Sequence, residues 1–240
     1  MENTKILPAG DSAVSVQFGN SIDLETYEKV RILHHQLTRS KFPGIVETLP
    51  TYRSLMVHYD PQLLPYHTLV SKLNKLLSTP EQADAFAKKT ITIPVCFGCQ
   101  YGEDLESVAA YHSTTPEEIV RLFCASSFLI YMLGFTPGYP YIGGVPKELA
   151  TPRLKTPRVK IPAGAVGIGG EQLGIYPLES PGGFQLVGRT PVHLYDPDRE
   201  TPVLLEAGEY IRFQSVTPAE YEKIKRQVDA GTYICQIKEG

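Results

Sequence analysis

Residues 159–189 read VKIPAGAVGIGGEQLGIYPLESPGGFQLVGR and decide the fold of the larger part of the chain. Short runs of aliphatic and aromatic residues alternate there with glycine and proline. Such runs, separated by turn residues, are typical of strands in an all-β barrel or sandwich. The pattern continues on both sides, so we expect a barrel or sandwich from residue 127 onward. The expected strands are FLIYML (128–133), VKIPAG (159–164), AVGIGG (165–170), LGIYPL (173–178), FQLVGR (184–189), VHLYD (192–196), VLLEA (203–207) and EYIRFQSV (209–216).

Helices and two further strands are expected around this β-rich region. The clearest helix signal is TTPEEIVRLF, which begins at residue 114. Thr115 is a good N-cap, Pro116 suits the first helical position, and Glu118 completes a capping box. The other expected elements are strands at 91–97 (ITIPVCF) and 232–238 (TYICQIK) and helices at 104–111 and 218–228.

The first 80 residues have a different pattern, in which strand and helix signals alternate without glycine or proline bias. Their order, βαββα, resembles a ferredoxin-like split unit. The polar segment STPEQADAFAKK (78–89) is expected to be a linker, so we expect two domains, residues 1–85 and residues 86–240. The strands are expected at 13–18, 45–49 and 54–59, and the helices at 24–37 and 63–77.

Composition excludes several classes of protein. The formal net charge of −3 argues against general nucleic-acid binding. The first residues lack a signal-peptide pattern, and the longest apolar stretch (122–134) is too short for a membrane span, so we expect a cytoplasmic protein. No GxxxxGK[ST], GxSxG or HExxH motif is present, which disfavours conventional ATP binding by this chain and the standard hydrolase and zinc-protease classes.

Cysteine and histidine give weak functional signals. Cys96 and Cys99 form a CxxC motif between a strand and a helix, the placement that a redox motif needs. A zinc site requires a second pair of ligands, and the other two cysteines are isolated, so a turn containing small residues is the favoured interpretation. His34 and His35 are adjacent on a predicted helix and point about 100° apart, so we expect surface positions and no metal site.

Residues 134–191 stand out because these 58 positions hold 12 of the 20 glycines and 9 of the 20 prolines. They also carry six basic and three acidic residues in a chain whose net charge is −3. Two interpretations remain open. The glycines and prolines form barrel corners and turns, or SPGG (180–183) and Arg189 form a pocket for a carboxylate. The stretch contains no recognisable activated nucleophile, so it reads as half of an active site.

Four motifs in this region resemble the allophanate hydrolase subunit 1 family, with similarity from residue 7 to residue 213. The family usually has tryptophan after SPGG, where this chain has Phe184. The resemblance implies an α+β protein with an N-terminal ferredoxin-like α/β sandwich and a C-terminal cyclophilin-like β-barrel. The motifs are GFTPGYPYIGG (134–144), TPRLKTPRVKIPAGAVGIGG (151–170), GIYPLESPGGFQLVGRTP (174–191) and LYDP (194–197).

The same resemblance implies a function that needs other chains. It implies one component of ATP-dependent 5-oxoprolinase, which opens 5-oxoproline to glutamate together with an A-type component and a KipA-like, C-type component. ATP is then used by the assembled enzyme, and this chain is expected to bind no cofactor itself. Inhibition of the sporulation histidine kinase A is also implied, and a purely protein-binding regulator without catalytic role is the alternative. No catalytic residue is assigned; the substrate-binding residues that the motifs imply are Arg158, Gln172, Tyr176, Gly182, Gly183 and Arg189, with Phe135 and Tyr141 as walls.

Overall fold

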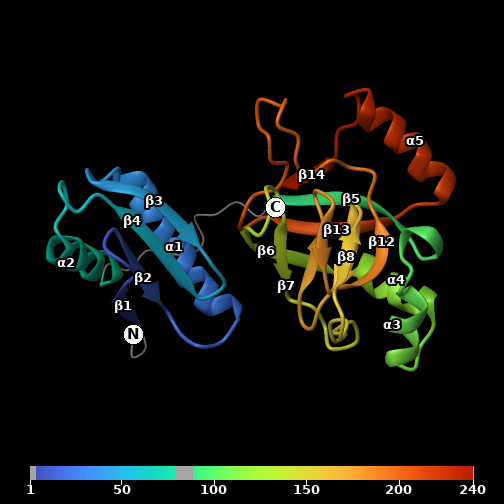
Figure 1. Cartoon of the computed structure of the whole chain (residues 1–240), viewed down its shortest axis with the longest axis horizontal. Coiled ribbons are helices and arrows are strands. Elements are labelled where there is room, and N and C mark those ends of the chain that lie inside the picture. Colours follow the sequence, from blue (N-terminus) through green and yellow to red (C-terminus); the bar gives the residue numbers. More distant parts are fainter. Residues whose placement is uncertain (1–3, 79–88, 240) are drawn as a thin grey trace. The chain divides into compact units, whose positions relative to one another are not determined.

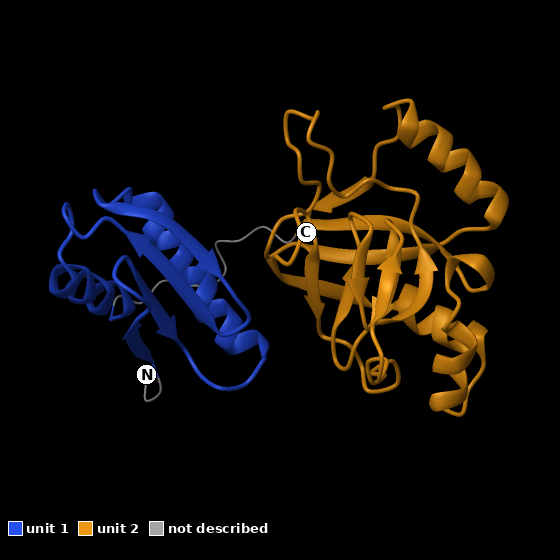
Figure 2. Cartoon of the chain, viewed as in Figure 1, with its two compact units in different colours: residues 1–87 blue, residues 88–240 orange. Residues whose placement is uncertain are grey.

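The computed structural model describes residues 4–78 and 89–239, and the chain divides into two compact units, residues 1–87 and 88–240 (Figure 2). The first unit is a two-layer α+β structure and the second is built around a closed β-barrel (Figure 1). The expected fold class, a mixed α+β protein with a separate barrel, is therefore confirmed. The domain boundary expected after residue 85, and most of the expected linker, lie outside the described residues.

The first unit contains the expected βαββα order and one additional strand. The sheet order is β1-β2-β4-β3, and every neighbouring pair is antiparallel. β1 was not predicted, because a four-residue segment that ends in proline gives little strand signal; it pairs along the outer edge of β2. The elements are β1 (Lys5–Pro8), β2 (Ala13–Gln17), α1 (Leu24–Ser40), β3 (Ile45–Pro50), β4 (Ser54–Tyr59) and α2 (Tyr66–Leu77).

Helix α1 packs on one face of this sheet, and α2 packs against α1. The N-cap of α1 is Asp23, whose carboxylate accepts a hydrogen bond from the Thr26 amide at 2.7 Å. The helix runs three residues beyond the predicted Leu37 and ends at Lys41, which is in the left-handed conformation (φ 43°). The residues buried between helix and sheet are Tyr27, Val30, Leu33, Leu37, Val14, Val16, Leu55, Val57 and Tyr59.

The second unit is built around a ring of seven strands. Their order is β12-β9-β10-β7-β6-β13-β5, and β12 pairs again with the end of β5 to close the barrel. β14 pairs with the beginning of β5, while β8 and β11 form a separate two-stranded ribbon. The strands are β5 (Lys89–Phe97), β6 (Ser127–Leu133), β7 (Pro140–Gly143), β8 (Arg158–Ile161), β9 (Ala165–Ile168), β10 (Leu173–Ile175), β11 (Ser180–Gly182), β12 (Gln185–Arg189), β13 (Tyr210–Ser215) and β14 (Gln236–Glu239).

Helices α3 (Leu105–Tyr111) and α4 (Pro116–Ala125) pack together, and α4 covers β13. Phe123 of α4 is fully buried, and its ring centroid lies 5.6 Å from that of Phe213. Burial of such a side chain contributes about 1.5–3 kcal/mol, so α4 is anchored mainly by its apolar face.

The predicted capping box of α4 is only half present. Thr115 accepts from the Glu118 amide at 3.3 Å, as predicted. The Glu118 carboxylate instead accepts from Arg121 at 2.6 and 2.7 Å, so the reciprocal bond to the cap is missing. A complete capping box occurs at α5 (Pro218–Asp229), between Thr217 and Glu220, where none was predicted.

Three strand predictions at the C-terminal end were wrong in whole or in part. VHLYD and VLLEA contribute only one isolated bridge, Tyr195 to Val203. Prolines at 191, 197 and 202 flank these segments and lack backbone donors, which disfavours extension of this bridge into a ladder. The segment TYICQIK becomes a strand only at Gln236. The amides of Thr232 and Tyr233 donate to the Gln227 carbonyl at 2.9 and 3.2 Å and therefore end α5 instead of extending a strand.

Candidate functional site

An aromatic cluster lies on the barrel between β7, β10, β12 and the β8–β11 ribbon. Tyr139, Tyr176 and Phe184 are buried and meet edge to face, with ring centroids 5.3 Å apart for the two tyrosines and 6.2 Å for Tyr176 and Phe184. Two further rings extend it to the surface, Phe135 and Tyr141, which lie 5.5 and 5.3 Å from Tyr139. We call these five residues the aromatic cluster. Ile161, Ala165 and Leu186 complete its apolar base.

Glycines make room for these rings. A Cβ atom on Gly174 would lie 2.1 Å from the Tyr139 hydroxyl, and one on Gly182 would lie 2.3 Å from the Tyr176 hydroxyl. A Cβ on Gly169 would lie 2.4 Å from the Phe184 ring. Real Cβ atoms do not approach other atoms this closely, so part of the glycine enrichment in residues 134–191 reflects ring packing. Ring packing differs from both earlier interpretations of the glycines, which were barrel turns and a pocket for a carboxylate.

Burial controls the ionisation of the two inner tyrosines. Burial raises the pKa of Tyr139 far above that of a free phenol, and the neighbouring tyrosines raise it further. Burial also raises the pKa of Tyr176, while hydrogen bonding with Tyr139 and the positive charge of Arg153 oppose that rise. Both side chains are therefore neutral hydroxyls at physiological pH and can serve as hydrogen-bonding groups but not as phenolate bases.

Residues 151–158 run alongside residues 183–186, and we call this segment the strap. Leu154 donates its amide to the Gly183 carbonyl at 2.7 Å, and Gln185 donates from its side-chain amide to the Pro152 carbonyl at 3.1 Å. These bonds fix the path of the strap on both sides of Arg153. The Arg153 guanidinium consequently lies over the Phe184 ring, with its carbon 4.9 Å from the ring centroid.

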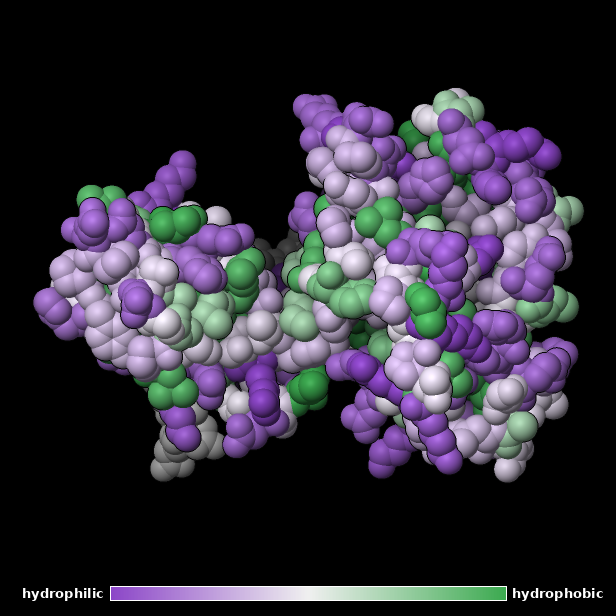
Figure 3. Space-filling view, viewed as in Figure 1, coloured by the Kyte–Doolittle hydropathy of each residue, from purple (hydrophilic) through white to green (hydrophobic). Residues whose placement is uncertain are grey.

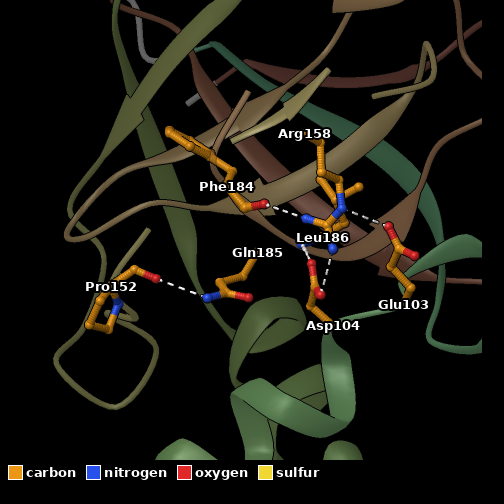
Figure 4. A network of polar contacts seen from close by, with 7 residues as sticks. All are labelled: Glu103, Asp104, Pro152, Arg158, Phe184, Gln185 and Leu186. Atoms are coloured by element: carbon orange, nitrogen blue, oxygen red, sulfur yellow. Dashed lines mark hydrogen bonds and ion pairs between the residues drawn. The ribbon is translucent and has the colours of Figure 1, made fainter. Parts of the chain in front are cut away.

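Arg158, at the end of the strap, is held by two carboxylates (Figure 4). Its Nη2 donates to Asp104 at 2.8 Å, and its Nε lies 3.0 Å from the Glu103 carboxylate. Its Nη1 donates to the Phe184 carbonyl at 3.3 Å. Asp104 is buried and also accepts from the Leu186 amide at 2.6 Å. The network joins the ribbon, β12 and the start of α3. The formal charges of Arg158, Glu103 and Asp104 add up to −1.

The structure gathers most of the predicted binding residues around the aromatic cluster. Tyr176, Phe135 and Tyr141 belong to it, and Gly182 contacts it. Gln172 reaches it through Arg153, which donates to its side-chain oxygen at 3.1 Å. The remaining members of the predicted set are Gly183, next to the strap, and Arg158, whose guanidinium faces Glu103 and Asp104.

Arg189 lies in a different environment. It follows Gly188 on β12 and pairs with Cys96 of β5, and its charge acts on Tyr221 of α5. Its Nε is buried without a hydrogen-bond partner in the part of the chain that the structure describes. Arg189 is therefore set apart from the other predicted binding residues.

Several residues of the site were missed in the sequence. Tyr139 and Arg153 lie inside the quoted family motifs, but neither spacing nor charge distinguished them from their neighbours. Glu103 and Asp104 lie about 50 residues before Arg158 in the chain, and only the fold brings them together. A buried carboxylate partner of this kind has no local sequence signal.

The CxxC segment runs from the end of β5 into a short 3₁₀ helix, Cys99–Tyr101. Cys99 is exposed and in the left-handed conformation (φ 46°), whereas Cys96 is buried, and burial raises the pKa of its thiol. A raised pKa disfavours the thiolate that redox chemistry requires. His34 is only partly exposed and accepts or donates a hydrogen bond with Thr48 at 2.8 Å. Within residues 4–78 and 89–239, no group of three or more His, Cys, Asp or Glu could hold a metal ion.

The surface near the site includes exposed apolar side chains. Val159 on the ribbon is 88% exposed, Phe135 is 59% exposed with a left-handed backbone (φ 66°), and Leu178 is 39% exposed. Figure 3 shows that hydrophilic residues cover most of one face of the chain, with apolar residues in small groups. No helix in the described part of the chain is long and apolar enough to cross a membrane.

The second unit is therefore a closed β-barrel with a two-stranded ribbon, and its candidate site is the aromatic cluster with Arg153 beside it. The chain belongs to the family described as carboxyltransferase domain, subdomain C and D, whose model matches residues 4–205. The family resemblance seen in the motifs is thereby confirmed.

Individual relatives agree with this assignment. The chain is 36% identical to the B subunit of 5-oxoprolinase from Bacillus subtilis (strain 168), over 91% of this chain and 95% of that protein. It resembles the crystal structure of TTHA0988 with a TM-score of 0.76 and 36% identity, over 85% of this chain but only 40% of that one. The fold is also that of a region of K. lactis urea amidolyase, with a TM-score of 0.82 and 24% identity, over 99% of this chain and 16% of that enzyme.

Proposed function

We propose that this chain is the B-type component of an ATP-dependent 5-oxoprolinase. In this role it acts with the A-type and C-type components to convert 5-oxo-L-proline, ATP and water into L-glutamate, ADP and phosphate. The observation that carries the proposal is the 36% identity to the B subunit of a 5-oxoprolinase, which extends over 95% of that protein. TTHA0988 and urea amidolyase are longer chains of which this one matches 40% and 16%, so they contribute less to the argument.

The aromatic cluster is the proposed contact for the substrate ring. A five-membered lactam with a carboxylate has two apolar faces and one charged end. Phe135, which is exposed, and the partly buried Tyr141 provide the ring surfaces that such a ligand would contact, and the buried Tyr139 supports both of them. Nucleotide handling and bond cleavage are assigned to the partner components, in agreement with the lack of a phosphate-binding motif in the sequence.

Exposed apolar side chains support a partner at this site. Val159, Phe135 and Leu178 are exposed on the ribbon and loops around the aromatic cluster. Exposed apolar side chains around a candidate site suit a contact with another protein chain. We propose that the C-type component covers this side of the barrel and completes the site.

The experiment is reconstitution of the assembled enzyme from its purified components. We expect ATP-dependent formation of glutamate from 5-oxoproline only when this chain is mixed with the A-type and C-type components. A Val159→Asp chain should weaken assembly, whereas Val46→Asp, which changes another exposed valine on the first unit, is the matched control. Full activity without this chain would refute the proposed function.

Inhibition of the sporulation histidine kinase A stays a prediction from the family resemblance, as does a purely regulatory role. The test is co-purification of the full chain with the dimerisation domain of the kinase, together with an autophosphorylation assay. A stoichiometric complex with loss of autophosphorylation would support inhibition. An unaltered autophosphorylation rate at saturating chain concentration would refute it.

A further inference from the structure

Two arginines adjoin the aromatic cluster, and they differ in how their charge is balanced. Arg158 contacts two carboxylates and a carbonyl, so three of its nitrogen atoms already have partners within the chain. Its side chain is 24% exposed. An additional anion at Arg158 would have to compete with Glu103 and Asp104, whose charges already exceed that of the guanidinium.

Arg153 is in the opposite situation. Its guanidinium contacts the side-chain oxygen of Gln172 and the face of the Phe184 ring, both of which are uncharged. No ion pair to Arg153 occurs among residues 4–78 and 89–239, and the side chain is exposed. Its charge also acts on the hydroxyls of both buried tyrosines, Tyr139 and Tyr176.

The position of Arg153 is set by the backbone. The strap is bonded to residues 183–186 immediately before and after it, through Pro152 and Leu154. The guanidinium carbon of Arg153 lies 4.9 Å from the centroid of the Phe184 ring, so the ring supports the guanidinium on one side. A planar, preorganised guanidinium without a carboxylate partner suits bidentate binding of a carboxylate.

We infer that Arg153 binds the carboxylate of the substrate, and that Arg158 is a positioning residue that holds the strap and ribbon in place. The inference rests on the proposed function, since 5-oxoproline supplies the carboxylate. Gln172 orients the guanidinium through its side-chain oxygen. This inference differs from the motif-based prediction, which places the substrate contact at Arg158, five positions later in the same segment.

The test compares an acid with its amide in the reconstituted enzyme. The A-type and C-type components are combined with the wild-type chain, Arg153→Gln, Arg153→Lys or the control Lys155→Gln, which removes one exposed charge from the same strap. The substrates are 5-oxoproline and its carboxamide, the latter measured as a competing inhibitor if it does not turn over. The ratio of the two affinities reports recognition of the carboxylate.

Arg153→Gln should raise the KM for 5-oxoproline about 10- to 100-fold and leave the carboxamide nearly unaffected. Arg153→Lys should give an intermediate value, because the charge is kept but the planar fork is lost. Lys155→Gln should behave as wild type. If the enzyme depends on this chain but Arg153→Gln keeps the wild-type ratio of the two affinities, or lowers kcat for 5-oxoproline without raising its KM, the role of Arg153 is refuted while the proposed function stands. Activity that does not need this chain refutes both.

Discussion

Gly182 and Gly183 are adjacent, yet the structure predicts opposite outcomes when each becomes alanine. A Cβ on Gly182 would lie 2.3 Å from the Tyr176 hydroxyl, 2.9 Å from Ile161 and 3.0 Å from the next atom of the tyrosine ring. Tyr176 is buried, so its ring has no solvent-filled space into which it could move. A Cβ on Gly183 would meet nothing closer than 3.7 Å, which is ordinary van der Waals contact. Neither glycine has a positive φ, so backbone strain does not enter the comparison.

Gly182→Ala should therefore destabilise the chain by about 1–3 kcal/mol, the usual cost of overpacking a core. Gly183→Ala should change stability by less than about 0.5 kcal/mol. Tyr176→Phe removes the atom that causes the worst contact, at a cost of about 1 kcal/mol for its hydrogen bonding. Gly182→Ala combined with Tyr176→Phe should consequently be less destabilising than the sum of the two, by about 1 kcal/mol or more.

The assay is urea unfolding of the full chain followed by circular dichroism, with thermal unfolding as a second measure. In a protein of this size about 1 kcal/mol corresponds to about 2–4 °C in Tm. Independent sites add to within about 0.5 kcal/mol, so a larger deviation is readily detected. Strict additivity of Gly182→Ala and Tyr176→Phe, or a Gly183→Ala variant as unstable as Gly182→Ala, would refute the packing role of Gly182.

Three further outcomes follow from the structure. Asp104→Ala should destabilise the second unit by about 1–3 kcal/mol, because it removes the acceptor of the buried Leu186 amide and of Arg158 Nη2, although Arg158 keeps Glu103 and the Phe184 carbonyl; wild-type stability in urea would contradict this. Exposed Cys99 should react with a thiol reagent at pH 8 well before Cys235, whose pKa burial raises to about 11, and Cys235 should become reactive only as the pH approaches that value; equal labelling rates by mass spectrometry would contradict the burial. Thr217→Ala should cost about 1 kcal/mol by removing the cap of α5, whereas Thr217→Ser should be nearly neutral; an equal loss in both would refute the capping role.

Elements with a strong local pattern were predictable. The βαββα order of the first unit and the strands β6, β9, β10, β12 and β13 follow from periodicity and turn residues. β1 and the loss of strand structure in 192–207 were not, because both depend on partners: β1 exists by pairing with β2, and the prolines in 192–207 leave too few donors for a ladder. Pairing between distant segments is not encoded in local periodicity.

Contacts between distant side chains in the candidate site were likewise not predictable from local sequence patterns. The motifs pointed to a region in which the structure places Tyr176, Phe135 and Tyr141 together. Net charge could not separate Arg153 from Arg158, because the difference between them is the presence of Glu103 and Asp104 beside only one. Whether an arginine is available to bind an anion depends on the carboxylates that lie beside it in the folded chain.

Some of the glycines in residues 134–191 belong to the same packing arrangement as the aromatic cluster. Tyr139, Tyr176 and Phe184 each occupy the space that a Cβ on Gly174, Gly182 or Gly169 would need. Because each ring depends on its glycine, a substitution in one partner should be tolerated only with a smaller residue in the other. The Phe184 ring lies under Arg153, so Gly169, which makes room for that ring, also helps to fix the position of the Arg153 guanidinium. A family member with alanine at the position of Gly182 should therefore lack a tyrosine at the position of Tyr176, and one that has both residues would count against this coupling.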